Sequence, residues 1–121
     1  YGKAATLAQQ LIQLRPDCFL PYNTLGSIAL AGKDYSRVIV YCQKVIDLEP
    51  DNAKAYVNRG VAYGNTDKHD RAIRDFDKAI ELDPSVASAY IGRAWAYSYL
   101  GQYTKQTADE ATACSLDSQW C

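Results

Sequence analysis

Apolar residues recur along this chain at the three-to-four-residue spacing of an α-helix. Residues 70–82 read DRAIRDFDKAIEL, which puts Ala, Ile and Phe on one face and charged residues on the other. Residues 53–64 read AKAYVNRGVAYG and carry small and aromatic residues on one face. The polar residues 65–67 between the two stretches are typical of a turn. This part of the chain is therefore predicted to form a helical hairpin.

The charged side of the second stretch is predicted to face solvent. Its acidic residues are interleaved with Arg74 and Lys78, and two pairs stand four residues apart on the helix. These pairs are Asp70 with Arg74 and Arg71 with Asp75. The acidic run from Asp75 to Asp83 is therefore interpreted as a solvated face. A calcium site is not expected, because calcium would need a loop and this run lies on a predicted helix.

Residues of the same kind return every 34 positions. The series are Pro16, Pro50 and Pro84; Leu14, Leu48, Leu82 and Leu116; Tyr22, Tyr56 and Tyr90; Gly26 and Gly60, with Ala94 in third place; and Tyr1, Tyr35, His69 and Tyr103. Self-similarity at this period is the signature of stacked structural repeats. Seven antiparallel helices are expected, and no strands.

The period also predicts where each unit begins and ends. A lone second helix is expected in residues 1–18, followed by helix pairs in 19–52, 53–86 and 87–121. Tight turns are expected near Lys33, Thr66 and Gly101, and helix ends at Pro16, Pro50 and Pro84.

The second unit resembles a tetratricopeptide repeat. The resemblance rests on Tyr56-x2-Arg59-Gly60-x2-Tyr63, then Ala72-x3-Phe76, Ala79 and Pro84. The first unit keeps Tyr22, Leu25, Gly26 and Pro50, and the third keeps Tyr90, Ala94, Tyr97, Gly101, Tyr103 and Ala113. In its second helix the third unit departs, since Gln106, Glu110 and Ser118 replace a small residue, an aromatic residue and the proline. The resemblance implies an all-α, right-handed α-solenoid of three full repeats plus an N-terminal half repeat.

Composition removes several classes of function. Thirteen Lys and Arg residues against 14 Asp and Glu residues give a net charge of -1, without the basic excess of a nucleic-acid binder. No apolar run approaches the ~20 residues that span a bilayer, so no membrane insertion is expected. No metal site and no cofactor are expected.

An enzyme is not expected either. The chain has a single histidine, and a thiol nucleophile would need Cys42 beside His69 as its base. Cys42 stands at the repeat position of Phe76, and His69 stands at that of Tyr35. Packing explains both residues.

The four cysteines form no CxxC pair. Free thiols at Cys18, Cys42, Cys114 and Cys121 are expected, and one disulfide is the alternative. Free thiols favour the cytoplasm, while the bacterial periplasm stays open.

The resemblance implies that the first helix of each repeat lines a concave groove that holds a peptide or helix of a partner protein. Carried over position by position, the peptide-binding residues are Asn23, Thr24, Ser27, Lys54, Val57, Asn58, Val61, Ile91, Trp95 and Tyr99. The same placement adds Leu20, Leu30, Asn65, Ser88, Gly92 and Ser98 to the groove.

Asn58 and Trp95 are the most suggestive of these positions. The Asn58 amide can hold a ligand backbone with one donor and one acceptor, or it can simply be solvated. Trp95 can anchor a partner, or it can pack against a neighbouring helix, and Tyr99 shares both alternatives. The clamp for acidic peptide termini found in this family needs a set of lysine, arginine and asparagine residues in the groove. Since only Asn58 of that set is present, acidic peptides are not expected to be preferred.

A scaffold that binds a partner protein is the favoured function. The alternative is a structural segment that forms homo-oligomers through the ends of its solenoid. An unpaired helix in residues 1–15 would leave Ala4, Leu7, Ala8 and Leu11 open, so fraying or self-association is expected there. The more polar last helix is expected to act as a cap.

Overall fold

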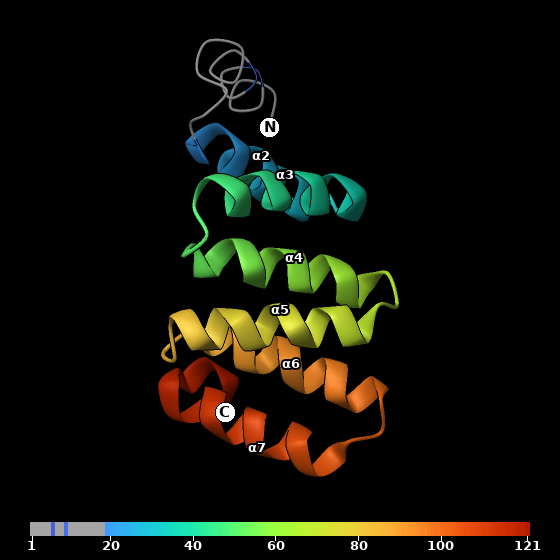
Figure 1. The fold of residues 1–121 in the computed structure, drawn as a ribbon. Coiled ribbons are helices and arrows are strands. Elements are labelled where there is room, and N and C mark those ends of the chain that lie inside the picture. The colour runs from blue at the N-terminus through green and yellow to red at the C-terminus, as the bar shows by residue number, and fades with distance from the viewer. Residues whose placement is uncertain (1–5, 7–8, 10–18) are drawn as a thin grey trace.

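The computed structural model describes Thr6, Gln9 and residues 19–121, and this part of the chain forms helices without any strand. The first helices of the three hairpins are α2 (Phe19–Ala31), α4 (Ala53–Asn65) and α6 (Ala87–Tyr99). The second helices are α3 (Tyr35–Leu48), α5 (His69–Leu82) and α7 (Tyr103–Leu116), and a short 3-10 helix, η1 (Ser118–Trp120), follows. Figure 1 shows the helices stacked from α2 and α3 at one end to α7 at the other.

The helix boundaries repeat with the sequence. Each first helix has 13 residues and each second helix has 14. The corresponding helices begin 34 residues apart. The predicted all-α solenoid is confirmed, and the six α-helices agree with six of the seven expected. The expected helix of residues 1–15, with its end at Pro16, falls almost wholly outside the described residues.

A left-handed residue closes the turn inside every hairpin. Lys33, Asp67 and Gly101 have φ angles of 60°, 63° and 76°. The amide that follows each of them, in Asp34, Lys68 and Gln102, donates a 2.9 Å hydrogen bond five residues back. This arrangement is a Schellman motif, which pairs carbonyls that a helix end would leave open. The turns expected near Lys33, Thr66 and Gly101 are confirmed.

The second helices end as predicted before Pro50 and Pro84. Glu49 and Asp83 leave the helical region, at φ -139° and -146°. Residues before proline are driven out of the helical region by the proline ring. Asp117 takes the same conformation at φ -149° although serine follows it, so here proline reinforces an ending that the fold also produces without it.

The core lies between the first and the second helices of the hairpins. It depends on the close approach of an aromatic ring to two glycines. Phe76 is 2% exposed, and its ring lies between Gly60 of its own hairpin and Gly92 of the next. A Cβ built on Gly60 would lie 2.9 Å from the ring, and one on Gly92 would lie 2.4 Å from it. Cys42 replaces this ring in the first hairpin, and there a Cβ on Gly26 would meet its sulfur at an ordinary 3.7 Å.

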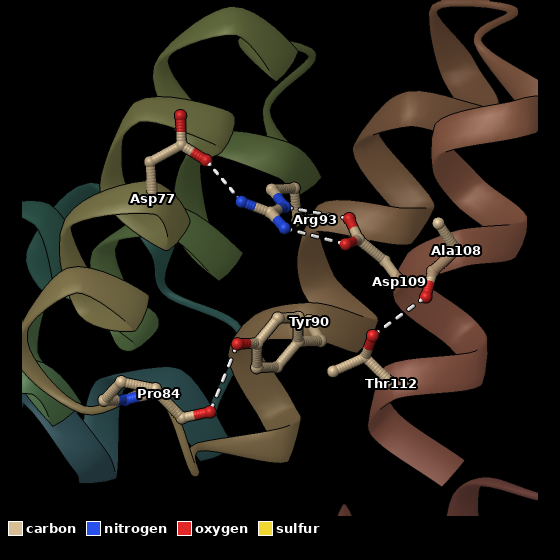
Figure 2. A network of polar contacts seen from close by, with 7 residues as sticks. All are labelled: Asp77, Pro84, Tyr90, Arg93, Ala108, Asp109 and Thr112. Carbon is tan, nitrogen blue, oxygen red and sulfur yellow. Dashed lines mark hydrogen bonds and ion pairs between the residues drawn. The ribbon is translucent and has the colours of Figure 1, made fainter. Parts of the chain in front are cut away.

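Two arginines repeat the same polar contact in successive hairpins. Arg59 of α4 donates two hydrogen bonds to Asp75 of α5, at 2.8 and 2.9 Å, and a third to Gln43 of α3. Arg93 of α6 does the same with Asp109 of α7, at 2.7 and 2.8 Å, and with Asp77 of α5 at 2.8 Å. Figure 2 shows the Arg93 network, together with the Tyr90 hydroxyl that donates to the Pro84 carbonyl. Each arginine therefore joins three helices.

The predicted solvent-facing pair of Arg71 with Asp75 is wrong. Asp75 is only 5% exposed, and its carboxylate faces Arg59 on the neighbouring helix. The Asp75 hydrogen bond raises the pKa of Arg59, and the Asp109 hydrogen bond does the same to Arg93. Asp77 and Asp83 are exposed, as expected for a solvated face, although Asp77 also pairs with Arg93.

Candidate functional site

A cavity of about 320 Å³ opens between α4 and α6. The second helix α5 contributes the side chains of Ala72 and Phe76 to its lining. The remaining lining residues come mainly from the two first helices, and they are Gly60, Val61, Gly64, Asn65, Ser88, Ile91, Gly92, Trp95, Ala96 and Tyr99, with His69 and Trp120. We call this feature the α4–α6 cavity. It lies where the repeat pattern puts the groove of the second and third units.

None of the fourteen residues that line the α4–α6 cavity is Asp, Glu, Lys or Arg. Asn65, Ser88 and His69 are the polar side chains, alongside the indole and phenol groups of the aromatic residues. The Asn65 amide already donates a 2.8 Å hydrogen bond to the Val61 carbonyl. The cavity is therefore apolar with a few uncharged hydrogen-bonding groups, which suits an uncharged ligand.

Exposed aromatic rings stand along α6. Trp95 is 61% exposed and Tyr99 is 74% exposed, which is unusual for side chains with so much apolar surface. No described helix covers most of the Trp95 side chain. Packing against a neighbouring helix therefore accounts for less than half of its surface. Both side chains make no hydrogen bond to any other residue that the structure describes. The polar atoms of both side chains and most of their surface are open to a ligand.

The Tyr99 ring lies on the imidazole of His69. The two ring centroids are 4.5 Å apart and the planes differ by 8°. His69 is the first residue of α5, and its side chain is only 13% exposed beneath Tyr99. Its Nδ1 is buried without a hydrogen-bond partner in the described part of the chain, and its Nε2 lies 3.9 Å from the Asp67 carboxylate. The stack fixes the orientation of the otherwise exposed phenol ring.

A disulfide holds Trp120 at the cavity. Cys114 in the last turn of α7 is bonded to Cys121, with Cα atoms 4.7 Å apart. Between them the Asp117 carboxylate accepts hydrogen bonds from the backbone and side-chain amides of Gln119, which shapes η1. The expectation of free thiols is wrong for Cys114 and Cys121, because the reversal of the chain after α7 brings together two cysteines seven residues apart. Cys18 lies outside the described residues.

The predicted site residues separate into groups. Val61, Ile91, Trp95 and Tyr99 line the α4–α6 cavity, together with the flanking positions Asn65, Ser88 and Gly92. Lys54, Val57 and Asn58 lie on α4 but outside that lining. On α2, Thr24 is exposed and Ser27 is half-buried, while nothing is described of the Asn23 side chain. The role of all ten residues in binding stays a prediction.

Val57 and Asn58 occupy less open positions than the groove pattern suggests. Val57 is 7% exposed and belongs to the core cluster that contains Phe76 and Ala89. Asn58 is also 7% exposed, and its amide makes no hydrogen bond with another described residue. Asn58 corresponds to Gly92 in the repeat.

Sequence reasoning missed His69 and Trp120 as members of the site. The repeat position of His69 predicts a packing role at the start of a second helix, but its contact with Tyr99 joins residues 30 positions apart. Trp120 reaches the cavity only through the chain reversal that the disulfide closes. The 34-residue period predicts neither the contact of His69 with Tyr99 nor the position of Trp120.

Cys42 is a core residue, as predicted. It is 3% exposed, and burial raises the pKa of its thiol to about 11. A thiol with that pKa is protonated at neutral pH and is a poor nucleophile. No cluster of three His, Cys, Asp or Glu side chains suited to a metal ion occurs among the described residues. Within the same residues, no helix combines the length and apolarity needed to cross a bilayer.

Family models described as tetratricopeptide repeat match the chain in three places. One matches residues 53–86, another matches residues 21–52, and a third matches residues 76–108. The first of these matches covers α4 and α5, the second covers most of α2 and all of α3, and the third begins within α5 and runs into α7. Among curated proteins, no relative matches the sequence.

Solved structures share the fold. The tetratricopeptide repeat domain of Arabidopsis OM64 has a TM-score of 0.78 at 28% identity, over 81% of this chain and 81% of that one. MamA from Desulfovibrio magneticus RS-1 has a TM-score of 0.87 at 22% identity, over 98% of this chain and 67% of that one. A MamA described as MSR-1 has a TM-score of 0.80 at 24% identity, over 97% and 67%. The two MamA structures support the solenoid fold.

Proposed function

The chain belongs to the tetratricopeptide repeat family and is in general terms a protein-interaction scaffold, and we propose that it binds an extended segment of a partner protein in the α4–α6 cavity. The partner is a protein or peptide. Neither nucleic acid nor a membrane is proposed as a ligand, and no enzymatic activity is proposed.

The observation that carries this proposal is the pair of exposed aromatic rings beside an apolar cavity. Tryptophan and tyrosine are the residues most enriched among those that dominate binding energy in protein interfaces. Trp95 and Tyr99 expose more than half of their surface and lie at the edge of a hollow that a ligand side chain can enter. A partner that covers them gains about 25 cal/mol of binding free energy for each Å² of apolar surface that it buries.

The uncharged polar groups of the cavity favour an extended segment over a helix. A helix satisfies its own backbone and would use only the apolar walls. An extended segment brings backbone carbonyls that need donors, and the Trp95 indole, the Tyr99 hydroxyl and the Ser88 hydroxyl can supply them.

Self-assembly through the ends of the solenoid receives no support of this kind. It rests on the apolar positions of residues 1–15, which lie outside the described part of the chain apart from Thr6 and Gln9. Partner binding at the α4–α6 cavity is therefore the function that we propose.

The test is selection from a displayed library of random peptides, followed by titration calorimetry on the selected sequences. Trp95→Ala is expected to weaken their binding at least about tenfold, which corresponds to ~1.4 kcal/mol. Tyr103→Ala is the matched control, since Tyr103 is a 66% exposed aromatic residue that does not line the cavity. Circular dichroism verifies that both variants keep their helix content. If Tyr103→Ala weakens binding as much as Trp95→Ala does, the assignment to this cavity is wrong.

A further inference from the structure

Resting on the proposed function, we infer that the segment bound in the α4–α6 cavity is proline-rich and adopts the polyproline II conformation. Four observations carry this inference: the charge of the lining, the spacing of its aromatic rings, the kind of hydrogen-bonding groups that it presents, and the support of the Tyr99 ring.

The charge of the cavity matches an uncharged ligand. Its fourteen lining residues contain no acidic and no basic side chain other than His69, whose ring is covered by Tyr99. An acidic or basic segment would lose hydration in this cavity and find no opposite charge. Proline-rich segments bury apolar rings with no charge to desolvate.

The spacing of the two rings matches a two-residue step of polyproline II. Trp95 and Tyr99 are four residues apart on α6, so their Cα atoms are separated by ~6 Å along the helix axis. Polyproline II rises ~3.1 Å per residue, so every second residue of the ligand advances by ~6.2 Å. With three residues per turn, residues i and i+2 of the ligand lie on adjacent edges of the polyproline II helix, so each of these two edges can contact one ring, as in other aromatic-lined grooves that bind such segments.

The hydrogen-bonding groups match a ligand that only accepts. Proline has no backbone N–H, so a proline-rich segment offers carbonyl acceptors. The Trp95 indole is a pure donor, and the hydroxyls of Tyr99 and Ser88 can donate as well. The indole and the phenol make no hydrogen bond to another described residue, so both can donate to the ligand.

The support beneath Tyr99 reduces the entropy lost on binding. Tyr99 is 74% exposed, yet its ring is stacked on His69 at 4.5 Å and nearly parallel to it. A ring that is already oriented loses little freedom when a ligand covers it, and polyproline II is itself largely preformed. His69 therefore acts as a positioning residue for Tyr99.

The cavity also sets the length of the segment. The stretch of α6 from Ser88 to Tyr99 is ~16 Å long at 1.5 Å per residue. Polyproline II covers this distance with about five residues. Nine-residue peptides therefore exceed the site and are suitable probes.

The test is titration calorimetry of the full chain with nine-residue oligoproline blocked at both ends. Two comparison peptides of the same length are an alternating Gly-Ser peptide and a peptide in which every second proline is alanine. Oligoproline is expected to bind at least about tenfold more tightly than the Gly-Ser peptide, with the half-substituted peptide between them. Absence of oligoproline binding at millimolar concentration, or equal binding of all three peptides, overturns the inference.

Variants locate the site and separate the role of His69. Trp95→Ala and Tyr99→Ala are each expected to weaken oligoproline binding at least about tenfold, and Tyr103→Ala is expected to leave it unchanged. His69→Ala is expected to weaken binding because Tyr99 loses its support, and His69→Phe is expected to restore it because a ring is retained. Binding that is insensitive to Trp95→Ala and Tyr99→Ala contradicts the inference.

The library selection distinguishes this inference from the proposed function. Selected peptides rich in proline support both. Selected peptides that contain no proline and still depend on Trp95 overturn the inference and leave the proposed function standing. Selected peptides of any composition that do not depend on Trp95 overturn both.

Discussion

The Phe76 ring contacts two neighbouring repeats because the glycines beside it have no side chain. Gly60 and Gly92 lie on opposite sides of the ring, on α4 and α6, and neither leaves room for a Cβ. Gly60 belongs to the repeat pattern, while Gly92 was predicted only as a groove position. The contact of Gly92 with a ring from the preceding hairpin is a tertiary feature, which a pattern read within one unit does not contain.

Replacing either glycine with alanine is therefore expected to destabilise the protein. Gly92→Ala would put a Cβ 2.4 Å from the Phe76 ring, and the resulting overpacking costs about 1–3 kcal/mol in the free energy of unfolding. Gly26→Ala is the matched control, because its Cβ would lie 3.7 Å from the Cys42 sulfur and the residue sits within a helix. This control should be neutral or stabilise by up to about 1 kcal/mol through helix propensity. Urea unfolding measures both, and equal effects would contradict the packing described for Phe76.

Removal of one of the paired arginines is also expected to lower the free energy of unfolding strongly. Arg59→Ala leaves the Asp75 carboxylate buried without its partner, which typically costs about 3–5 kcal/mol. Arg37→Ala removes an exposed ion pair with Asp34, in which the two side chains are 71% and 47% exposed, and should cost less than about 1 kcal/mol. A difference smaller than about 1 kcal/mol between the two variants in urea unfolding would argue against a buried pair.

At the scale of the elements, the three hairpin turns share one backbone conformation and differ in residue. Lys33, Asp67 and Gly101 all have positive φ, and only glycine adopts this region without a steric penalty. The sequence predicts the position of the turns from the period, yet Lys33 and Asp67 carry no glycine signal. The left-handed conformation at these two residues follows from the Schellman geometry of the turn.

Exchanging these residues should move stability in opposite directions. Asp67→Gly relieves a left-handed conformation worth roughly 1 kcal/mol and is expected to raise the melting temperature. Gly101→Ala introduces the same strain, at a position where nothing lies within 4 Å of the new Cβ, and is expected to lower it. Calorimetry on both variants checks the prediction, and a lower melting temperature for Asp67→Gly would show that its side chain matters more than its backbone.

The last element depends on the Cys114–Cys121 disulfide. Reduction with dithiothreitol opens the link and is expected to free η1 and Trp120, while the hairpins, held by their own core, stay folded. Tryptophan fluorescence should change and far-ultraviolet circular dichroism should stay nearly the same. Cys114→Ser combined with Cys121→Ser should reproduce the reduced spectrum without reductant. Loss of most helix signal on reduction would mean that the disulfide supports the whole stack.

For the whole molecule, the sequence predicted the parts that repeat. The fold class, the helix boundaries, the turns and the core positions of Cys42 and Phe76 follow from a 34-residue period and helical spacing. The parts that required the structure join residues from different units. They are the Asp75 carboxylate facing Arg59, the His69 ring beneath Tyr99 and the position of Trp120. Spacing within one helix cannot reveal these contacts.

The candidate site shows the same division. Trp95, Tyr99, Val61 and Ile91 were predicted in the groove and line the α4–α6 cavity, because positions on one face of a first helix stay together in any stack of such hairpins. Val57 was assigned to the same face and instead contributes to the core. A first helix packs against both its own partner and the next hairpin, so its groove face is narrower than helical spacing alone suggests.

The central claim is that a partner segment binds in the α4–α6 cavity, and nuclear magnetic resonance tests it most directly. The chain has two tryptophans, Trp95 and Trp120, and both line this cavity, so their two indole N–H signals report on it. On addition of a selected peptide, both indole signals and the backbone amides of Gly64, Gly92 and Tyr99 are expected to shift together, with one common dissociation constant. Shifts that leave both indole signals unchanged and gather around Val40 on α3 or Tyr103 on α7 would contradict the claim.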